Sequence, residues 1–436
     1  MASIWIGFLI LVVLVILGVP IAWSFGAATV WFTLSLGYSA DFLFPTAYMK
    51  LNGVVILAIP LFILAGGIME RSDIGEALVT FVQCFVGKIK GALCIVGTVS
   101  CAVFGSICGC GMATLSCIGS ILAPKMREKK YPMGIASAVI VCSAPIGMLI
   151  PPSSIQILYA WSGQLSVLAC FLATVVPGLI VTALISIVGF VMCRRHPEIE
   201  VDDIDAGTTW AAHTAKSTVH AIPALMMPII ILGGIYGGFM TPSEAAGISC
   251  VYAVPVGMFI YKKLTIKRLG ETLTETAAST GAIMVMLAII MVMARILVSE
   301  DVPGMILDLL MAISTNKIVI LLMLNIFLVI IGMIMDDVSG TLLCTPILIP
   351  IAIELGVSPY QMAAILGVNL GMGNITPPTA PFLYVGSRIF KTSAKEMIGP
   401  CLWIILFAYI PTLILTTYFP QVSLWLPMHM LPNVQF

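Results

Sequence analysis

The feature that most constrains this chain is a proline pair that occurs twice, each time inside an apolar segment. Residues 145–154 read Pro-Ile-Gly-Met-Leu-Ile-Pro-Pro-Ser-Ser, and residues 371–380 read Gly-Met-Gly-Asn-Ile-Thr-Pro-Pro-Thr-Ala. The two pairs are 226 residues apart (377 − 151). Proline removes a backbone donor and clashes with the preceding turn, so each pair must interrupt a helix. Interruptions at matching positions of two halves predict a transporter with a central binding site.

The composition indicates where these interrupted helices reside. Of the 436 residues, 60% are hydrophobic and only 9% are charged, whereas a soluble domain carries about 25% charged residues. Apolar runs of roughly 18–20 residues recur, each long enough to cross the about 30 Å hydrocarbon core of a bilayer. The formal net charge of zero argues against a nucleic-acid partner. We therefore predict an all-α polytopic protein of the lipid bilayer.

Ten segments are predicted to span the membrane. The first apolar run, Ile4 to Leu17, has no basic residue before it, which indicates a span rather than a removed signal peptide. The predicted spans are 3–19, 21–38, 53–70, 132–162, 167–192, 219–238, 243–261, 277–298, 359–388 and 398–419.

Two longer apolar stretches, at about 93–124 and 318–350, have polar, glycine-containing centres at 105–111 and 332–340. Such stretches predict re-entrant hairpins, whose irregular tips must be covered by protein or face a water-filled cavity. Each half then contains one hairpin and five spans, one of which is the broken helix.

The charges give an orientation. Basic residues flank the first hairpin on both sides: Lys88, Lys90, Lys125, Arg127, Lys129 and Lys130. This hairpin is therefore expected to open to the cytoplasm, and the second, flanked by Lys317 and Glu354, to the opposite face. Five spans reverse the direction once, so the second half is predicted to be inverted relative to the first.

The predicted organisation is a first repeat at 1–195, a polar cytoplasmic linker at 196–217 and an inverted second repeat at 218–436. Two amphipathic segments, Asp73–Lys90 and Lys262–Thr276, precede the buried elements of each half. They are predicted either to lie along the membrane surface as braces or to be ordinary loop helices.

Two adjacent carboxylates occupy the second predicted tip, at Asp336 and Asp337. Each costs about 2.5–3.5 kcal/mol inside a membrane unless a cation or hydrogen-bond donors lie beside it. A cation ligand at Asp336 is one interpretation. The other is that an aspartate merely caps the second helix of the hairpin, with Ser339 and Thr341 adding local hydrogen bonds.

Polar side chains also flank the two breaks. Asn374 and Thr376 precede the second proline pair, and Ser153 and Ser154 follow the first. They could simply satisfy backbone groups that the breaks leave free. Because the break is duplicated, we favour ligand binding: carbonyl and side-chain oxygens suit a hard cation such as Na⁺, and free amides attract an anion.

The first predicted tip carries thiols at Cys108 and Cys110, with Cys101 and Cys117 nearby. Their spacing matches no standard metal-ligand pattern, and no span supplies a histidine partner. We predict small residues that let the hairpin legs pack closely. The 12 cysteines as a set are predicted to be free thiols.

With these residues in view, the chain resembles the large membrane subunit of TRAP transporters, the tripartite ATP-independent periplasmic (DctM-like) family. The resemblance covers nearly the full length and is specific at these segments: 59–70 (Ile-Pro-Leu-Phe-Ile-Leu-Ala-Gly-Gly-Ile-Met-Glu), 118–124, 150–153, 238–246, 335–336, 346–350 and 375–378.

The resemblance implies an elevator mechanism, Na⁺ as the coupling ion with no other cofactor, and substrates such as C4-dicarboxylates or sialic acids. It also implies two partners, a small four-span membrane subunit and a periplasmic substrate-binding protein, and a location in the bacterial inner membrane. The elevator's moving domain would hold both hairpins and both broken helices.

Carried onto this sequence, the resemblance gives three sets of site residues. The second Na⁺ site is expected at Gly332, Asp336, Gly373, Asn374 and Thr376, and the first at Cys108, Gly111, Gly147 and Ile150. The substrate is expected beside Pro152, Ser153, Ser154, Thr341, Pro378 and Thr379.

The first tip departs from the family pattern. Residues 108–111 read Cys-Gly-Cys-Gly where the family usually has Ser-Gly-Ser-Ser. Thiols are poor Na⁺ ligands and glycine offers only its backbone. The first cation site is expected to rest on carbonyl groups, to be weaker, or to be absent.

Two other functions are open to this sequence. A stand-alone Na⁺/divalent-anion symporter of similar architecture would need no binding protein. A membrane-embedded redox enzyme would use the cysteine cluster, and would contain stoichiometric metal. Nothing in the sequence resembles a nucleotide-binding loop or a hydrolytic triad, so we predict a transporter that is not an enzyme.

Overall fold

The computed structural model describes residues 2–72, 74–86, 89–200, 210–432 and 434, and in this part of the chain every regular element is a helix. The first half contains α1 (Ala2–Ile16), α2 (Ile21–Leu36), α3 (Ala40–Leu51), α4 (Ala58–Glu70), α5 (Ile74–Val86), α6 (Ala92–Cys108), α7 (Gly111–Glu128), α8 (Met133–Ser143), α9 (Ser154–Ser162) and α10 (Val167–Arg194). The second contains α11 (Trp210–Tyr236), α12 (Pro242–Pro255), α13 (Ile266–Ser299), α14 (Val302–Ile313), α15 (Lys317–Ile334), α16 (Asp337–Glu354), α17 (Pro359–Gly373), α18 (Pro381–Phe390), α19 (Ala394–Ile404), α20 (Ile410–Tyr418) and α21 (Pro420–Met430).

Short irregular helical turns extend several of these helices. 3₁₀ turns precede α4 (Val54–Leu57) and follow α8 (Ala144–Met148), and π-helical turns follow α12 (Val256–Ile260) and join α19 to α20 (Ile405–Tyr409). Within the described residues, seven helices are long and apolar enough to cross a membrane, or eight if the bent pair Leu43–Leu51 and Val54–Glu70 is one span. The predicted all-α polytopic class is confirmed.

Both predicted hairpins are present as pairs of helices joined by a short turn, but their tips are shorter than predicted. α6 continues to Cys108 and ends at Gly109, whose φ of 62° lets its amide bond back to the Gly105 carbonyl. α7 begins two residues later, so the reversal occupies Gly109 and Cys110 rather than 105–111. The second tip is likewise confined to Met335 and Asp336, rather than 332–340, because Asp336 caps α16 directly.

Both predicted helix breaks are present at the proline pairs. α8 and its 3₁₀ turn end at Met148, and α9 starts at Ser154. α17 ends at Gly373, and α18 starts at Pro381. The intervening segments, 149–153 and 374–380, contain the prolines that cannot donate a helical hydrogen bond.

One predicted boundary was wrong, and three short helices were missed. The amphipathic segment 262–276 and the span 277–298 form one continuous helix, α13, because no proline interrupts them and Thr265 caps its start. The segment 73–90 contains α5, which packs against α6 and α11; residues 73, 87 and 88 of this segment lie outside the described residues. The short helices α3, α14 and α21 were not predicted.

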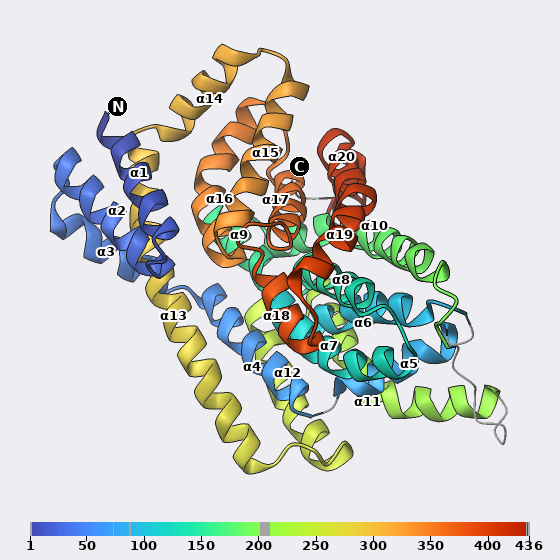
Figure 1. The fold of residues 1–436 in the computed structure, drawn as a ribbon. Helices are drawn as coiled ribbons and strands as arrows, with labels where there is room; N and C mark the ends of the chain where they lie inside the picture. Colours follow the sequence, from blue (N-terminus) through green and yellow to red (C-terminus); the bar gives the residue numbers. More distant parts are fainter. Residues whose placement is uncertain (1, 73, 87–88, 201–209, 433, 435–436) are drawn as a thin grey trace.

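The helices form two regions around the interrupted elements. α13 runs the length of the molecule beside α2, α3 and α4 (Figure 1). The hairpins and broken helices pack crosswise: α16 of the second hairpin contacts α9, and α7 of the first hairpin contacts α18. The helix that follows each break, α9 or α18, therefore packs against the hairpin of the other half.

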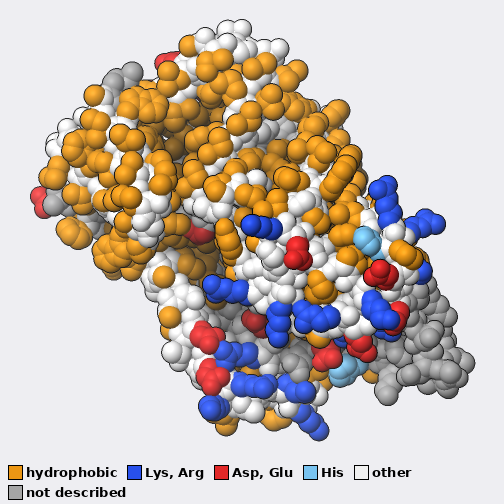
Figure 2. All heavy atoms as spheres, in the orientation of Figure 1, with side chains coloured by type: hydrophobic (Ala, Val, Ile, Leu, Met, Phe, Trp, Pro, Cys, Tyr) orange, Lys and Arg blue, Asp and Glu red, His pale blue; other side chains and the backbone are white. Residues whose placement is uncertain are grey.

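The surface indicates how the molecule sits in a membrane. Figure 2 shows the Lys and Arg side chains gathered at one end, over the ends of α4, α7 and α13, below a face that is almost entirely hydrophobic. Ion pairs at this end join Arg71 to Glu271 and Glu275. A basic, charged end beneath an apolar belt is typical of the cytoplasmic side of an inner-membrane protein.

Candidate functional site

Each hairpin meets the broken helix of its own half through a pair of glycines. A Cβ atom placed on Gly105 would lie 2.4 Å from the Cα of Gly147, and one placed on Gly373 would lie 2.6 Å from the Cα of Gly332. Real Cβ atoms do not approach other atoms this closely, so only glycine permits these backbones to touch. The structure thus brings Gly147 to the first hairpin and Gly332 to Gly373, as the predicted sites require.

The first tip is fastened to the first break by hydrogen bonds. The Gly109 carbonyl accepts from the Ser154 amide at 3.2 Å and from the Ser154 hydroxyl at 2.9 Å. Ser153 donates to the Met148 carbonyl at 2.7 Å and accepts from the Gln156 amide, so it caps α9. Both serine hydroxyls, which were predicted to bind substrate, therefore satisfy backbone groups in this arrangement.

The two halves also meet at the site. A Cβ on Gly111, at the start of α7, would lie 2.9 Å from the Cζ of Phe382 on α18. The Phe382 amide in turn donates to the Asn374 carbonyl at 3.4 Å, and a Cβ on Gly371 would lie 3.1 Å from Pro145 Cβ. Both hairpin tips and both breaks therefore belong to one contiguous cluster of interrupted backbone, here called the break cluster.

Asp336 occupies the N-cap position of α16. Its carboxylate accepts hydrogen bonds from the Val338 amide at 3.1 Å and the Ser339 amide at 3.3 Å, and also from the Ser339 hydroxyl. Capping, which the sequence left open as the alternative to cation binding, is thus present. A carboxylate has about four acceptor positions, so these bonds leave capacity for a cation.

Asn374 is the most unusual side chain of the cluster. It is fully buried, yet neither its Oδ1 nor its Nδ2 has a hydrogen-bond partner. A buried amide without partners costs several kcal/mol, roughly 1–3 per group left unsatisfied. Thr341, also buried, likewise has an unbonded hydroxyl. These atoms are free to bind a ligand that enters the cluster.

The other residues that were predicted to belong to the sites differ in their exposure to solvent. The Thr376 hydroxyl donates to the Met372 carbonyl at 2.6 Å, and the Ile150 amide to the Ile146 carbonyl. Pro152 is buried, with its carbonyl against Gly109, whereas Pro378 and Thr379 are exposed. The first break is thus closed over by protein, and the second presents its proline loop at the surface.

The thiols of the first tip bond to the tip itself. The Cys108 thiol lies 3.3 Å from the Thr114 hydroxyl and 3.4 Å from the Cys110 carbonyl, and all 12 cysteines are free. Among the described residues no three histidine, cysteine or acidic side chains gather as metal ligands. The Cys108 thiol therefore contributes to the packing of the turn.

Sequence reasoning missed a buried amide network beside the second hairpin. Asn369 on α17 donates to Asn325 Oδ1 on α15 at 2.8 Å, and Asn325 donates to the Thr417 hydroxyl at 3.1 Å. Gln156 on α9 reaches the Ala363 carbonyl of α17 at 3.3 Å. The sequence could have indicated this network, because an amide side chain in an apolar span is costly unless it has a hydrogen-bond partner.

Helical hairpins, helices interrupted at proline pairs and an apolar belt define the class: a multi-pass helical transport protein. The chain belongs to the family described as tripartite ATP-independent periplasmic transporter, DctM component, whose model matches residues 8–422. The resemblance inferred from the sequence is confirmed. The protein is accordingly a transport permease of the inner membrane and not an enzyme.

Individual relatives agree with this assignment. The chain is 32% identical to the C4-dicarboxylate TRAP transporter large permease protein DctM of Vibrio cholerae, covering 96% of each chain. It is also 32% identical to the isethionate TRAP transporter permease protein DctMQ of Oleidesulfovibrio alaskensis, covering 94% of this chain and 64% of that relative.

A solved structure shares the fold. The YdaH transporter of Alcanivorax borkumensis, described as having an unusual topology, matches with a TM-score of 0.64 at 17% identity, over 89% of this chain and 90% of that one. At this identity the match establishes the fold alone.

Proposed function

We propose that this protein imports a small organic anion, most simply a carboxylate, in symport with Na⁺, as the large membrane subunit of a TRAP system. Relatives named for C4-dicarboxylate and isethionate transport support an anionic substrate. In this proposal the break cluster holds both the cation and the anion, and the subunit works with a small membrane subunit and a periplasmic binding protein.

The observation that carries the cation part is the unpartnered side chain of Asn374. Its amide oxygen is buried beside the contact between Gly332 and Gly373, where two helix ends expose backbone carbonyls. A Na⁺ ion bound there would satisfy that oxygen and draw on the spare acceptor positions of Asp336. Because the Asp336 carboxylate is already held in place as the N-cap of α16, Na⁺ binding would require no reorientation of α16.

The anion part rests on the direction of four helices. α7, α9, α16 and α18 all begin at the break cluster, at Gly111, Ser154, Asp337 and Pro381. Helix N-termini carry a partial positive charge and free amides, so a carboxylate or sulfonate is stabilised where several of them converge. The exposed loop at Pro378 and Thr379 gives such an anion a route to solvent.

The elevator part concerns which helices move together. The hairpins and broken helices are bound to one another through the glycine contacts and crosswise packing described above. α13 lies outside them with α2, α3 and α4 (Figure 1). We infer that the outer helices form a scaffold and that the break cluster slides along α13 as one body.

The partner subunits follow from the family's tripartite description. The isethionate relative is longer than this chain, which covers only 64% of it, so its additional sequence leaves room for a fused membrane subunit. We propose that a small four-span membrane subunit and a periplasmic binding protein complete the transport system.

Uptake by proteoliposomes tests the proposal. The chain is reconstituted with its small subunit, and uptake of radiolabelled C4-dicarboxylate or isethionate is measured with and without a Na⁺ gradient and binding protein. We expect uptake only when both are present. Uptake by this chain alone would instead identify the stand-alone symporter, and Na⁺-independent uptake would refute ion coupling at Asp336 and Asn374.

A further inference from the structure

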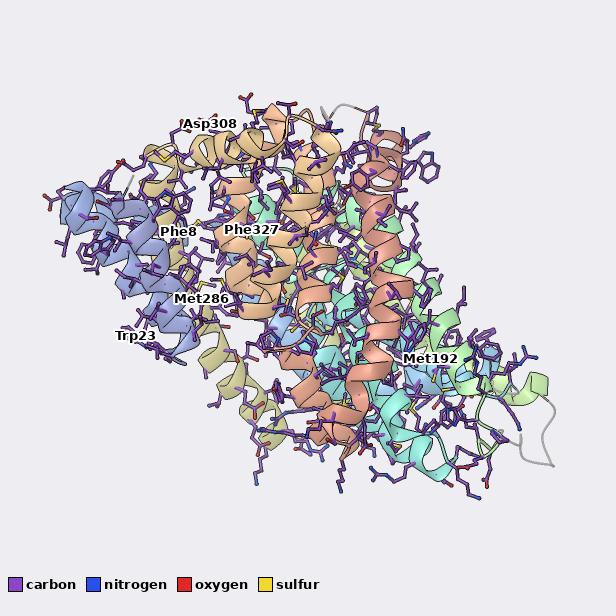
Figure 3. All side chains as sticks on the ribbon, turned by 45° about the horizontal axis from the view of Figure 1, so that its top comes forward. Phe8, Trp23, Met192, Met286, Asp308 and Phe327 are labelled. Carbon is purple, nitrogen blue, oxygen red and sulfur yellow. The ribbon has the colours of Figure 1, made fainter. Side chains whose placement is uncertain are left out.

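A groove on the outside of the molecule has no role in the proposed transport cycle. It has a volume of about 650 Å³ and lies between α10 and the helix formed by α19 and α20, with Ile135 of α8 at its floor. This volume falls within the roughly 300–1,000 Å³ typical of pockets that bury small molecules. Met192 of α10, labelled in Figure 3, is one of the residues that line this groove.

One wall is a single stripe of α10. Its lining positions are 184, 187, 188, 191, 192 and 195, which repeat at the three- and four-residue spacing of one helix face. From Leu184 to Arg195 this stripe rises about 16 Å, at 1.5 Å per residue. That length is about half of the roughly 30 Å hydrocarbon core, which is the depth of one leaflet.

The other wall is aromatic. Trp403 and Phe407 stack with their ring centroids 5.3 Å apart and their planes only 7° from parallel. Phe407 belongs to the π-helical turn Ile405–Tyr409, and such turns recur at functional positions of helices. Both rings remain about half exposed, at 56% and 48%. Two flat, exposed rings opposite a stripe of aliphatic side chains form a slot suited to a hydrocarbon chain.

The groove changes character at one end. Arg195 and His196 close it where α10 ends, at the charged end of the molecule. Phosphate groups of the inner leaflet lie at this level, and basic pockets between helices on the cytoplasmic side recognise anionic headgroups. Glu200, five residues after Arg195, is paired with Lys130 at 2.6 Å.

From this arrangement we propose that the groove between α10 and α19 is a binding site for an anionic phospholipid of the inner leaflet. One acyl chain lies along Leu184–Met192 against Trp403 and Phe407, and the phosphate contacts Arg195 and His196. A partner helix is a poorer fit, because it would present a continuous stripe across both leaflets rather than a charged head above a one-leaflet slot.

Native mass spectrometry of the delipidated full chain tests this proposal. The protein is titrated with phosphatidylglycerol and with phosphatidylcholine of the same acyl chains. We expect tighter binding of phosphatidylglycerol, and a loss of about fivefold in R195Q, the factor that one basic residue contributes near an anionic lipid. Phosphatidylcholine carries the same phosphate but is net neutral because of its choline cation, so its binding should weaken less in R195Q than that of phosphatidylglycerol.

Two further variants sharpen the result. R194Q removes the same charge one residue away, at a position that does not line the groove, and should lose less affinity for phosphatidylglycerol than R195Q does. The double variant W403A/F407A should weaken both lipids equally. Equal affinity of the wild type for the two lipids, an unchanged R195Q, or displacement of bound phosphatidylglycerol by the small membrane subunit would overturn the proposal.

Discussion

Gly373, the last residue of α17, lies against Gly332 of α15 so closely that a Cβ on Gly373 would sit 2.5 Å from the Gly332 carbonyl carbon. The contact is between two backbones, so no side-chain rotation can relieve it. It fixes the second hairpin to the second break immediately beside Asn374. The predicted second cation site depends on this contact for its shape.

Replacing Gly373 with alanine is therefore expected to separate α15 from α17. Overpacking of this kind costs about 1–3 kcal/mol. We expect a lower unfolding temperature in detergent and a loss of Na⁺-dependent uptake that exceeds any loss of folded protein. G399A is the matched control, because a Cβ at Gly399 would meet nothing within 4 Å. If G373A transports normally, the second site does not rest on this contact.

Asp336 can be divided into its two roles by a pair of substitutions. Asparagine is as good an N-cap as aspartate, so D336N should leave the stability of α16 nearly unchanged, whereas D336A should lose about 1 kcal/mol. Neither variant offers a carboxylate to a cation. We expect both to lose Na⁺-dependent uptake, and only D336A to unfold at a lower temperature. Normal Na⁺ coupling in D336N would restrict Asp336 to capping.

The corresponding position of the first tip has a weaker cap. Cys110 precedes α7 as Asp336 precedes α16, but its side chain makes no capping hydrogen bond. Serine is a strongly preferred N-cap, so C110S should stabilise the first tip by about 0.5–1 kcal/mol. Thermal unfolding of the purified protein measures the gain. C84S, at a half-buried cysteine inside α5, is the control and should give none.

The elements that the sequence predicted well are those with a local physical cause. Each proline pair removes backbone donors wherever it is placed, so both breaks were foreseen. Tip boundaries were not, because Gly109 ends α6 through a left-handed conformation that could equally have occurred at Gly105 or Gly111. The sequence contains several candidate glycines, and packing selects one.

The site was predictable only in part, for a related reason. Asn374 attracted notice because it stands beside a break, but its unpartnered amide is a property of the packed structure. Asn325 and Asn369 look like isolated polar residues in the sequence. Their 2.8 Å hydrogen bond exists because α15 packs against α17, and that pairing of distant segments has no local signature.

The ion pair between Lys130 and Glu200 predicts a pH dependence at the cytoplasmic end. Lys130 lowers the pKa of Glu200 below its usual 4.5, and Glu200 raises the pKa of Lys130 above 10.5. Because the pKa of Glu200 is lower in the folded than in the unfolded protein, its carboxylate stabilises the fold at pH values above the unfolded-state pKa. That stabilisation is lost as the pH falls through the folded-state pKa. Because the pKa of Lys130 is higher in the folded protein, its ammonium group stabilises the fold at pH values below the unfolded-state pKa, and that stabilisation is lost as the pH rises through the folded-state pKa.

The contribution of the pair should therefore be complete between about pH 5 and pH 10, and be lost as the pH falls through the lowered pKa of Glu200 or rises through the raised pKa of Lys130. We expect E200Q to lower the unfolding temperature slightly at pH 7, and the difference from the wild type to disappear as the pH falls through the lowered pKa of Glu200. Because both groups are exposed, 1 M salt should remove most of the difference at pH 7. A difference that persists in acid would attribute the effect to packing rather than charge.

The proposed sliding motion makes a prediction at the contact between α13 and the second hairpin. The Ser339 hydroxyl, which donates to Asp336, lies 2.9 Å from the Met286 sulfur, so the Ser339 and Met286 side chains are in contact in this conformation. If α13 belongs to the scaffold and the hairpin moves, joining these positions must stop transport. In the variant M286C/S339C, we expect Hg²⁺ to bridge the two thiols and abolish uptake, and a thiol reductant to restore it.

The references for this experiment are the wild type and the two single variants under the same Hg²⁺ treatment. They are needed because the native thiols also bind Hg²⁺, and because S339C alone removes one hydrogen bond to Asp336. After Hg²⁺ treatment, uptake by the double variant should fall well below uptake by either single variant. Without Hg²⁺ it should not. A fully bridged protein that still transports would place α13 within the moving body, and the division into scaffold and break cluster would have to be redrawn.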